Sequence, residues 1–273
     1  MIEVVYSNGC SHSAGGGLEL SKELDNQKGI LVKDTYNKIH GVNWNTQSEV
    51  TYIARLAEKL NCEYVNDAAS GGGSNRVVRM AYEFVKKNWY RKDKLFLFLE
   101  FPAFFSRLDI YSNALNAYLI LNQTLNEDGK RIFLYATREY YNNYTLDDFN
   151  IVNKDKHVSN YLDSFSNYFV EVEKVKREIE TFLSFLELHN IKYIFCEGGK
   201  EIQQTLPDSI LQNELSIETI YGIEHDFHHW CMQTKQTIKD ELNEQTKDLH
   251  PGYFAHINFA NILYEHIIKK YNI

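Results

Sequence analysis

Short hydrophobic runs alternate with segments of helical periodicity through the first hundred residues of this chain. Runs at 2–6, 62–66 and 95–101 have the length and the β-branched or aromatic content of strands. Between them, residues 47–60 and 75–88 carry apolar side chains at three- and four-residue steps, which predicts two helices. Such alternation is typical of a parallel sheet covered by helices on both faces. We therefore expect an α/β fold in which the carboxyl ends of the strands meet at one edge of the sheet.

The alternation returns in the last third of the chain. Residues 191–197 predict a buried strand, and residues 253–270 carry the periodicity of an amphipathic helix. Residues 159–189 repeat apolar side chains at alternating four- and three-residue steps, which predicts one long helix. We expect this helix to pack on its own sheet. A self-association helix is the alternative, and it leaves a homo-oligomer open.

The segment 107–158 breaks the alternation. It is rich in Tyr and Asn, with helical signals at 114–125 and a strand signal at 132–135. We interpret it as an insertion that forms a cap, a substrate wall or an oligomer surface. The chain has no internal repeat and no low-complexity tract, so we expect a single domain over residues 1–273.

Composition and charge narrow the class of protein. The chain is 44% hydrophobic and 24% charged, which is ordinary for a soluble globular protein. A net charge of −8 argues against a nucleic-acid partner, because binding to phosphate needs a basic face. No apolar run approaches the ~20 residues that cross a bilayer, and the N-terminus lacks the basic start and apolar core of a signal peptide. We expect a cytoplasmic protein with neither a nucleic-acid nor a membrane partner.

Four cysteines lie far apart in the sequence, without the paired spacing of a disulfide framework or a zinc site. Most of them fall in or beside apolar stretches, where a free cysteine behaves as a small core residue. We interpret them as reduced thiols, in keeping with a cytoplasmic location. They are Cys10, Cys62, Cys196 and Cys231.

Residues with catalytic potential follow the strands at the predicted sheet edge. Ser11 comes just after the first strand, and three successive glycines at 71–73 come after the second. Near the other end of the chain, Asp248 and His250 stand one residue apart, before the last helix. A serine hydroxyl needs a base to take its proton, histidine suits that task near neutral pH, and a carboxylate holds the histidine ring. The pattern predicts a Ser–His–Asp triad if the two ends of the chain meet.

Three short blocks resemble those of a known family, the SGNH (GDSL-like) hydrolases. Gly9-Cys10-Ser11 stands where that family has Gly-Asp-Ser. The glycine-rich segment 66–75 resembles the second block of the family, and Asp248-Leu249-His250-Pro251 resembles its last block. The blocks occur in the order of the family and are spread along nearly the whole chain.

The resemblance implies both a fold and an activity. The fold would be a flavodoxin-like three-layer α/β/α domain around a central parallel sheet. The activity would be ester hydrolysis, with Ser11 as nucleophile, His250 and Asp248 as its partners, and neither a metal nor another cofactor. The backbone N–H groups of Ser11 and Gly72 would form the oxyanion hole, with Gly71 as the second choice for the glycine.

The chain departs from the family pattern in the first and last blocks. Cys10 stands where the family has Asp, and Leu249 alone separates the acid from the histidine where two residues are usual. Cys10 is also an alternative nucleophile, because a thiolate is intrinsically more nucleophilic than a hydroxyl. A residue directly after Gly9 at a strand end is equally expected to point into the core.

A third departure concerns the oxyanion hole. Residues 100–107, which correspond to the third block, lack the Asn that the family uses as an oxyanion donor. Asn75 or Arg107 is the candidate to replace it, and both are expected substrate-binding residues. Losing one oxyanion donor costs about 3 kcal/mol of transition-state stabilisation, which implies a slow or specialised enzyme.

These observations predict a serine esterase that acts on an acyl ester, most often acetyl, of a carbohydrate or small molecule. A catalytically silent carbohydrate-binding protein on the same fold is one alternative, favoured by the missing Asn and by 19 Tyr residues. A metal-dependent hydrolase is the other, and adjacent histidines count against it because both cannot readily face one ion on regular backbone. Its ligands would come from His225, Asp226, His228 and His229.

Overall fold

A four-stranded parallel sheet lies at the centre of the molecule. The computed structural model describes residues 1–16, 18, 50–69, 72–102, 107–112, 117–125, 131–138, 168–197, 227–241 and 249–273. The central sheet consists of β1 (Val4–Asn8), β2 (Glu63–Asn66), β3 (Leu95–Phe101) and β7 (Lys192–Glu197). The strand order is β2-β1-β3-β7, which is the order of a flavodoxin-like doubly wound sheet.

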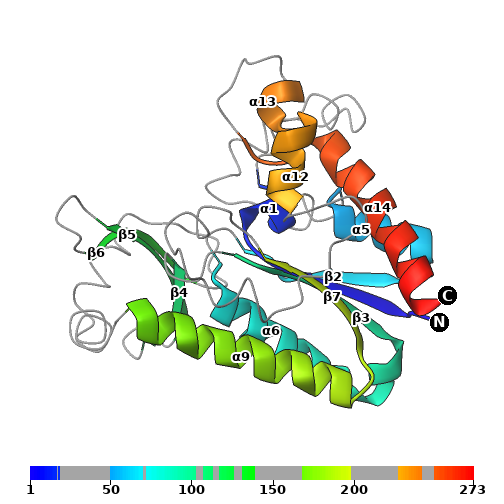
Figure 1. The fold of residues 1–273 in the computed structure, drawn as a ribbon, viewed down its shortest axis with the longest axis horizontal. Helices are drawn as coiled ribbons and strands as arrows, with labels where there is room; N and C mark the ends of the chain where they lie inside the picture. Colours follow the sequence, from blue (N-terminus) through cyan, green and yellow to red (C-terminus); the bar gives the residue numbers. More distant parts are fainter. Residues whose placement is uncertain are drawn as a thin grey trace.

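Helices cover both faces of this sheet (Figure 1). One face carries α5 (Tyr52–Leu60), α12 (Phe227–Thr234) and α14 (Tyr253–Tyr271), and the other carries α6 (Ser74–Lys87) and α9 (Tyr168–Leu188). Successive residues of the strands face alternate cores, so β3 sends Phe96 and Phe98 toward α14 and Leu97 and Leu99 toward α9. Because both faces are covered, β1 and β3 are buried along their whole length. The predicted three-layer α/β/α fold is confirmed.

The long helix α9 packs on its own sheet, as expected. Four residues of its apolar seam are buried in the same core as β3, namely Val175, Ile179, Phe182 and Leu186. Residues 159–167, predicted to begin this helix, lie outside the described residues. No helix among the described stretches is both long and apolar enough to span a lipid bilayer.

Three antiparallel strands form a second sheet in the segment interpreted as an insertion. They are β4 (Arg107–Ser112), β5 (Ala117–Leu125) and β6 (Arg131–Arg138), in the order β4-β5-β6. The strand expected at 132–135 is confirmed within β6, whereas the helical prediction for 114–125 is wrong. The leucine- and isoleucine-rich run of β5 suits either structure, and backbone pairing with a strand on each side favours the strand.

The second sheet is attached to α6 near the carboxyl edge of the central sheet. Arg79 of α6 makes an ion pair with Asp109 of β4, with 2.8 Å between Nε and Oδ2. The same guanidinium lies 3.6 Å from the centre of the Tyr118 ring on β5. These contacts hold the second sheet beside the start of α6, which follows the glycine-rich loop.

Substitution of two phenylalanines of α14 tests which face of this helix packs into the core. Phe259 is fully buried and packs against Phe98, whereas Phe254 is 46% exposed. We expect Phe259→Ala to lower the free energy of unfolding by about 3–5 kcal/mol, because it removes buried apolar contacts and leaves a cavity. Phe254→Ala on the same helix is the control and is expected to change it by less than about 1 kcal/mol. Urea titration followed by circular dichroism measures both, and equal losses would contradict this description of the core.

Candidate active site

Ser11 stands at the carboxyl edge of the central sheet, where β1 turns into a helix. β1 ends at Asn8, and the short helix α1 (Ser11–Ala14) begins three residues later. The Ala14 N–H donates to the Cys10 carbonyl over 3.0 Å, so the helix starts directly at the turn. Gly15 then adopts a positive φ of 81°, a conformation that favours glycine and ends the helix. Ser11 is thereby fixed as the first residue of a helix, where backbone N–H groups lack helical partners.

His250 stands on a loop that is held by backbone hydrogen bonds. Its carbonyl accepts from the Ile238 N–H over 2.9 Å, and the Gly252 N–H donates to the Gln236 carbonyl over 2.8 Å. Ile238 begins α13 (Ile238–Glu241), and the Glu241 carboxylate accepts from the Phe254 N–H at the start of α14 over 2.9 Å. The loop is therefore tied to the elements before and after it.

The structure brings Ser11 and His250 together from positions 239 residues apart in the sequence. His250 Nε2 lies 3.0 Å from Ser11 Oγ, within hydrogen-bonding distance. Gly16 lies beside both residues, because a Cβ at this position would stand 3.3 Å from His250 Cδ2 and 3.1 Å from the Ser11 carbonyl oxygen. With Nε2 unprotonated, the ring can accept the serine proton, which is the geometry required of a nucleophile and its base.

Asp248, the predicted acid of the triad, lies outside the described residues, and so does Gly71. Gly72 lies beside the turn that leads to Ser11, since a Cβ on it would stand 3.1 Å from the Gly9 carbonyl oxygen. Its N–H donates to the Ala69 carbonyl over 2.9 Å. Gly72 thus lies beside Gly9, two residues before Ser11, and in this conformation its N–H is bonded within the glycine-rich loop.

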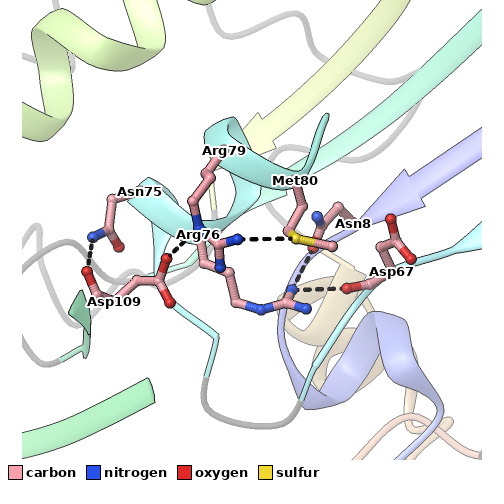
Figure 2. A network of polar contacts seen from close by, with 7 residues as sticks. All are labelled: Asn8, Asp67, Asn75, Arg76, Arg79, Met80 and Asp109. Atoms are coloured by element: carbon pink, nitrogen blue, oxygen red, sulfur yellow. Dashed lines mark hydrogen bonds and ion pairs between the residues drawn. The ribbon is translucent and has the colours of Figure 1, made fainter. Parts of the chain in front are cut away.

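Asn75 and Arg107 lie next to that loop. Asn75 Nδ2 donates to the backbone carbonyl of Asp109 over 3.2 Å (Figure 2). Arg107 Nη1 lies 3.4 Å from the Gly72 carbonyl oxygen, and the Arg107 backbone packs against Gly73. Both predicted substrate-binding residues are therefore found where β4 passes the start of α6, one on each element.

A buried arginine that sequence reasoning did not select fixes the end of β1. Arg76 on α6 is only 4% exposed, and its Nη1 donates to Asn8 Oδ1 over 3.1 Å and to the Asp67 carbonyl over 2.7 Å (Figure 2). Asn8 Oδ1 also accepts from the Gly9 N–H over 2.8 Å. The sequence does contain an indication of this role. Arg76 is a charged residue directly before Val77, which lies on the face of α6 that packs on the sheet.

A buried carboxylate was missed as well. Glu100 is 1% exposed and interrupts the otherwise apolar strand β3, which was the available signal. It accepts a hydrogen bond from the Ser13 hydroxyl, two residues after Ser11. Burial raises the pKa of Tyr52 well above its ordinary value, and the Glu100 charge acts in the same direction.

The alternative nucleophile, Cys10, is turned into the molecule. Its side chain is 2% exposed, and its Sγ lies 3.9 Å from Glu100 Oε1, whereas Ser11 Oγ contacts His250. All four cysteines are free thiols. The structure therefore offers Ser11, rather than Cys10, to His250.

The alternative metal cluster is only partly described. His228 lies on α12, whereas His225 and Asp226 fall outside the described residues, as does the side chain of His229. Within the part of the chain that the structure describes, no group of three or more His, Cys, Asp or Glu side chains converges as a metal site would require.

Comparison with known proteins finds similarity among solved structures only. No family profile matches the sequence, and no curated protein matches it. The psychrotrophic esterase EstA from Pseudoalteromonas sp. is 13% identical with a TM-score of 0.45, over 99% of this chain and 100% of that chain. The acetyl xylan esterase Est2A from the rumen bacterium Butyrivibrio proteoclasticus is 13% identical with a TM-score of 0.44, over 99% of this chain and 64% of that chain.

The half-buried thiol of Cys62, at the amino edge of the sheet just before β2, provides a pH-dependent test of the packing there. Burial raises the pKa of Cys62 to about 11, and the neighbouring Glu63 carboxylate acts in the same direction. We expect iodoacetamide to modify Cys62 slowly at about pH 8 and to reach half of its maximal rate only near pH 11, because the thiolate is the reactive species and half of the thiol is ionised at its pKa. Peptide mass spectrometry over time gives the rate, with the urea-unfolded chain as control. Equal rates for the folded and unfolded chains at the lower pH would contradict it.

Proposed function

We propose that this protein is a serine esterase in which Ser11 is the nucleophile and His250 is the general base. The proposal rests on the 3.0 Å contact between Ser11 Oγ and His250 Nε2 at the carboxyl edge of a parallel sheet. Ligands of open α/β sheets bind at this edge, so a substrate can reach both groups there. Asp248 is the proposed third member, and it would accept a hydrogen bond from Nδ1–H of the same ring.

The proposed reaction needs only groups of the chain and water. Ser11 Oγ attacks the acyl carbonyl while its proton passes to His250 Nε2, which gives a tetrahedral oxyanion. The C–O bond to the alcohol then breaks, and the alcohol leaves with the proton from Nε2. Water attacks the acyl-Ser11 ester as His250 takes a water proton. Collapse of the second tetrahedral intermediate releases the carboxylic acid and returns the proton to Ser11.

Among its described residues, the site offers few hydrogen-bond donors to stabilise the oxyanion. The Ser11 N–H, at the first residue of α1, is one proposed donor. The Gly72 N–H is the second proposed donor, and it must exchange its bond to the Ala69 carbonyl for one to substrate. Losing one such donor costs about 3 kcal/mol of transition-state stabilisation, which is a reason to expect slow turnover.

The proposed substrate is an acyl ester, most often acetyl, of a carbohydrate or small molecule. Asn75 and Arg107 flank Gly72 and Gly73 and are the proposed contacts to it. Arg107 brings a cationic group with several donors, and Asn75 brings an amide, so both suit an oxygen-rich substrate. These groups would orient the alcohol part of the ester beside Ser11.

Hydrolysis of p-nitrophenyl acetate tests the proposal. We expect Ser11→Ala and His250→Gln to lower kcat/KM by at least about 10³-fold, because each removes one member of the nucleophile–base pair. Cys10→Ala is expected to keep serine-dependent hydrolysis, since the Cys10 thiol is buried and contacts Glu100. Circular dichroism and the Tm establish that each variant is folded.

Covalent labelling identifies the nucleophile independently of turnover. A fluorophosphonate is expected to modify Ser11 in the wild type and to leave His250→Gln largely unmodified, as read by peptide mass spectrometry. A Ser11→Ala variant that hydrolyses at the wild-type rate would overturn the proposal. A folded wild type with neither hydrolysis nor labelling would favour the catalytically silent carbohydrate-binding protein, and activity lost on treatment with EDTA would favour the metal-dependent hydrolase.

A further inference from the structure

A carboxylate is buried directly beneath the turn that carries Ser11. Glu100 lies one residue before the end of β3 and is 1% exposed, and its neighbours Leu99 and Phe101 are apolar and equally buried. A carboxylate is rarely buried unless hydrogen bonds compensate for the loss of water. The contacts of Glu100 therefore indicate its role in the structure. None of the proposed chemical steps uses this group.

The contacts of Glu100 form a chain of hydrogen bonds with a fixed direction. The Ser13 hydroxyl donates to Glu100 Oε2 and accepts from the Tyr52 hydroxyl over 2.9 Å. The Tyr52 hydroxyl has a single proton, so it accepts from the Ser7 hydroxyl, 3.1 Å away. The chain joins β1, α5, α1 and β3, and it ends on the carboxylate. Each bond polarises the next, so the acceptor at the end strengthens the whole chain.

Gly9 shows how closely the carboxylate approaches the turn. A Cβ at this position would stand 2.7 Å from Ser13 Oγ and 2.9 Å from both Cβ and Oε2 of Glu100. Only a residue without a side chain fits there, so the turn before Ser11 is packed onto the Glu100–Ser13 pair. Cys10 Sγ, 3.9 Å from Glu100 Oε1, adds a weaker contact from the next residue.

We propose that Glu100 is a positioning residue for Ser11. It holds Ser13, Ser13 lies on the same single turn of helix as Ser11, and that turn sets the direction of Ser11 Oγ toward His250. The effect of Glu100 on catalysis rests on the function proposed above. The effect of Glu100 on the Ser11–His250 contact does not depend on that function. A shift of the nucleophile lowers the rate of attack without weakening substrate binding, because the reacting atoms must be aligned closely.

Steady-state kinetics with p-nitrophenyl acetate tests the catalytic consequence. We expect Glu100→Gln to lower kcat about 10- to 100-fold with KM within about threefold of the wild type. Ser13→Ala is expected to do the same from the other end of the bond and keeps the carboxylate. The double variant should lose no more than the larger single variant, because both act through one contact. Ile194→Val, buried on the neighbouring strand β7, is the control for general loss of stability and should keep the wild-type kcat.

The ¹⁵N NMR signal of His250 tests the effect on geometry, and it needs no turnover. Ser11→Ala gives the Nε2 shift of a ring without its serine partner. We expect Glu100→Gln and Ser13→Ala to move the wild-type shift toward that value. A folded Glu100→Gln protein with an unchanged shift and kcat within about twofold of the wild type would overturn the inference, even if its Tm is lower. If Glu100→Gln does not fold, Ser13→Ala decides by the same two measurements.

The same design separates the two proposals. An active wild type with Ser11-dependent hydrolysis and an unaffected Glu100→Gln variant would reject the positioning role and keep the esterase. An inactive wild type would reject the esterase, and the His250 signal would then decide alone whether Glu100 fixes the Ser11–His250 contact.

Discussion

The parallel pairing of β1 between β2 and β3 is the constraint on which the rest of the structure depends. In this register Ser7 stands opposite Asn66 on one side and Phe98 on the other, so all three strands end at nearly the same level. The turn after β1, the glycine-rich loop after β2 and the end of β3 therefore face one another. Had β1 paired in antiparallel fashion, Ser11 would lie at the opposite edge from the glycine-rich loop.

Two buried charges of opposite sign lie on either side of the turn that leads to Ser11. The Arg76 guanidinium holds Asn8 from α6, and the Glu100 carboxylate holds Ser13 from β3. Between them the backbone of Gly9 passes where no side chain would fit. Backbone strain is thus not needed to present Ser11. Hydrogen bonds from two neighbouring elements define the turn, and such bonds are strong because water is excluded from them.

The sequence predicted the layered fold and the pairing of Ser11 with His250 better than the details around them. Strands and helices followed from periodicity, because burial on one or both faces imposes it. The strand β5 was missed because its leucine- and isoleucine-rich run suits a helix as well as a strand, and pairing with β4 and β6 decides between them. Gly72 was selected from the sequence, but the hydrogen bond of its N–H to the Ala69 carbonyl depends on the geometry of the loop. Glu100 and Arg76 stood out only as charges in apolar surroundings, and their partners come from β1 and α1.

Ser11 and His250 meet although they stand 239 positions apart in the sequence. During synthesis, β1 and α1 leave the ribosome well before the loop carrying His250 and the core helix α14. A nascent chain therefore contains Ser11 before the His250 that contacts it has been made. Because α14 also packs into the core on its side of the sheet, we expect completion of that core and formation of the Ser11–His250 contact to fall in the same step of folding.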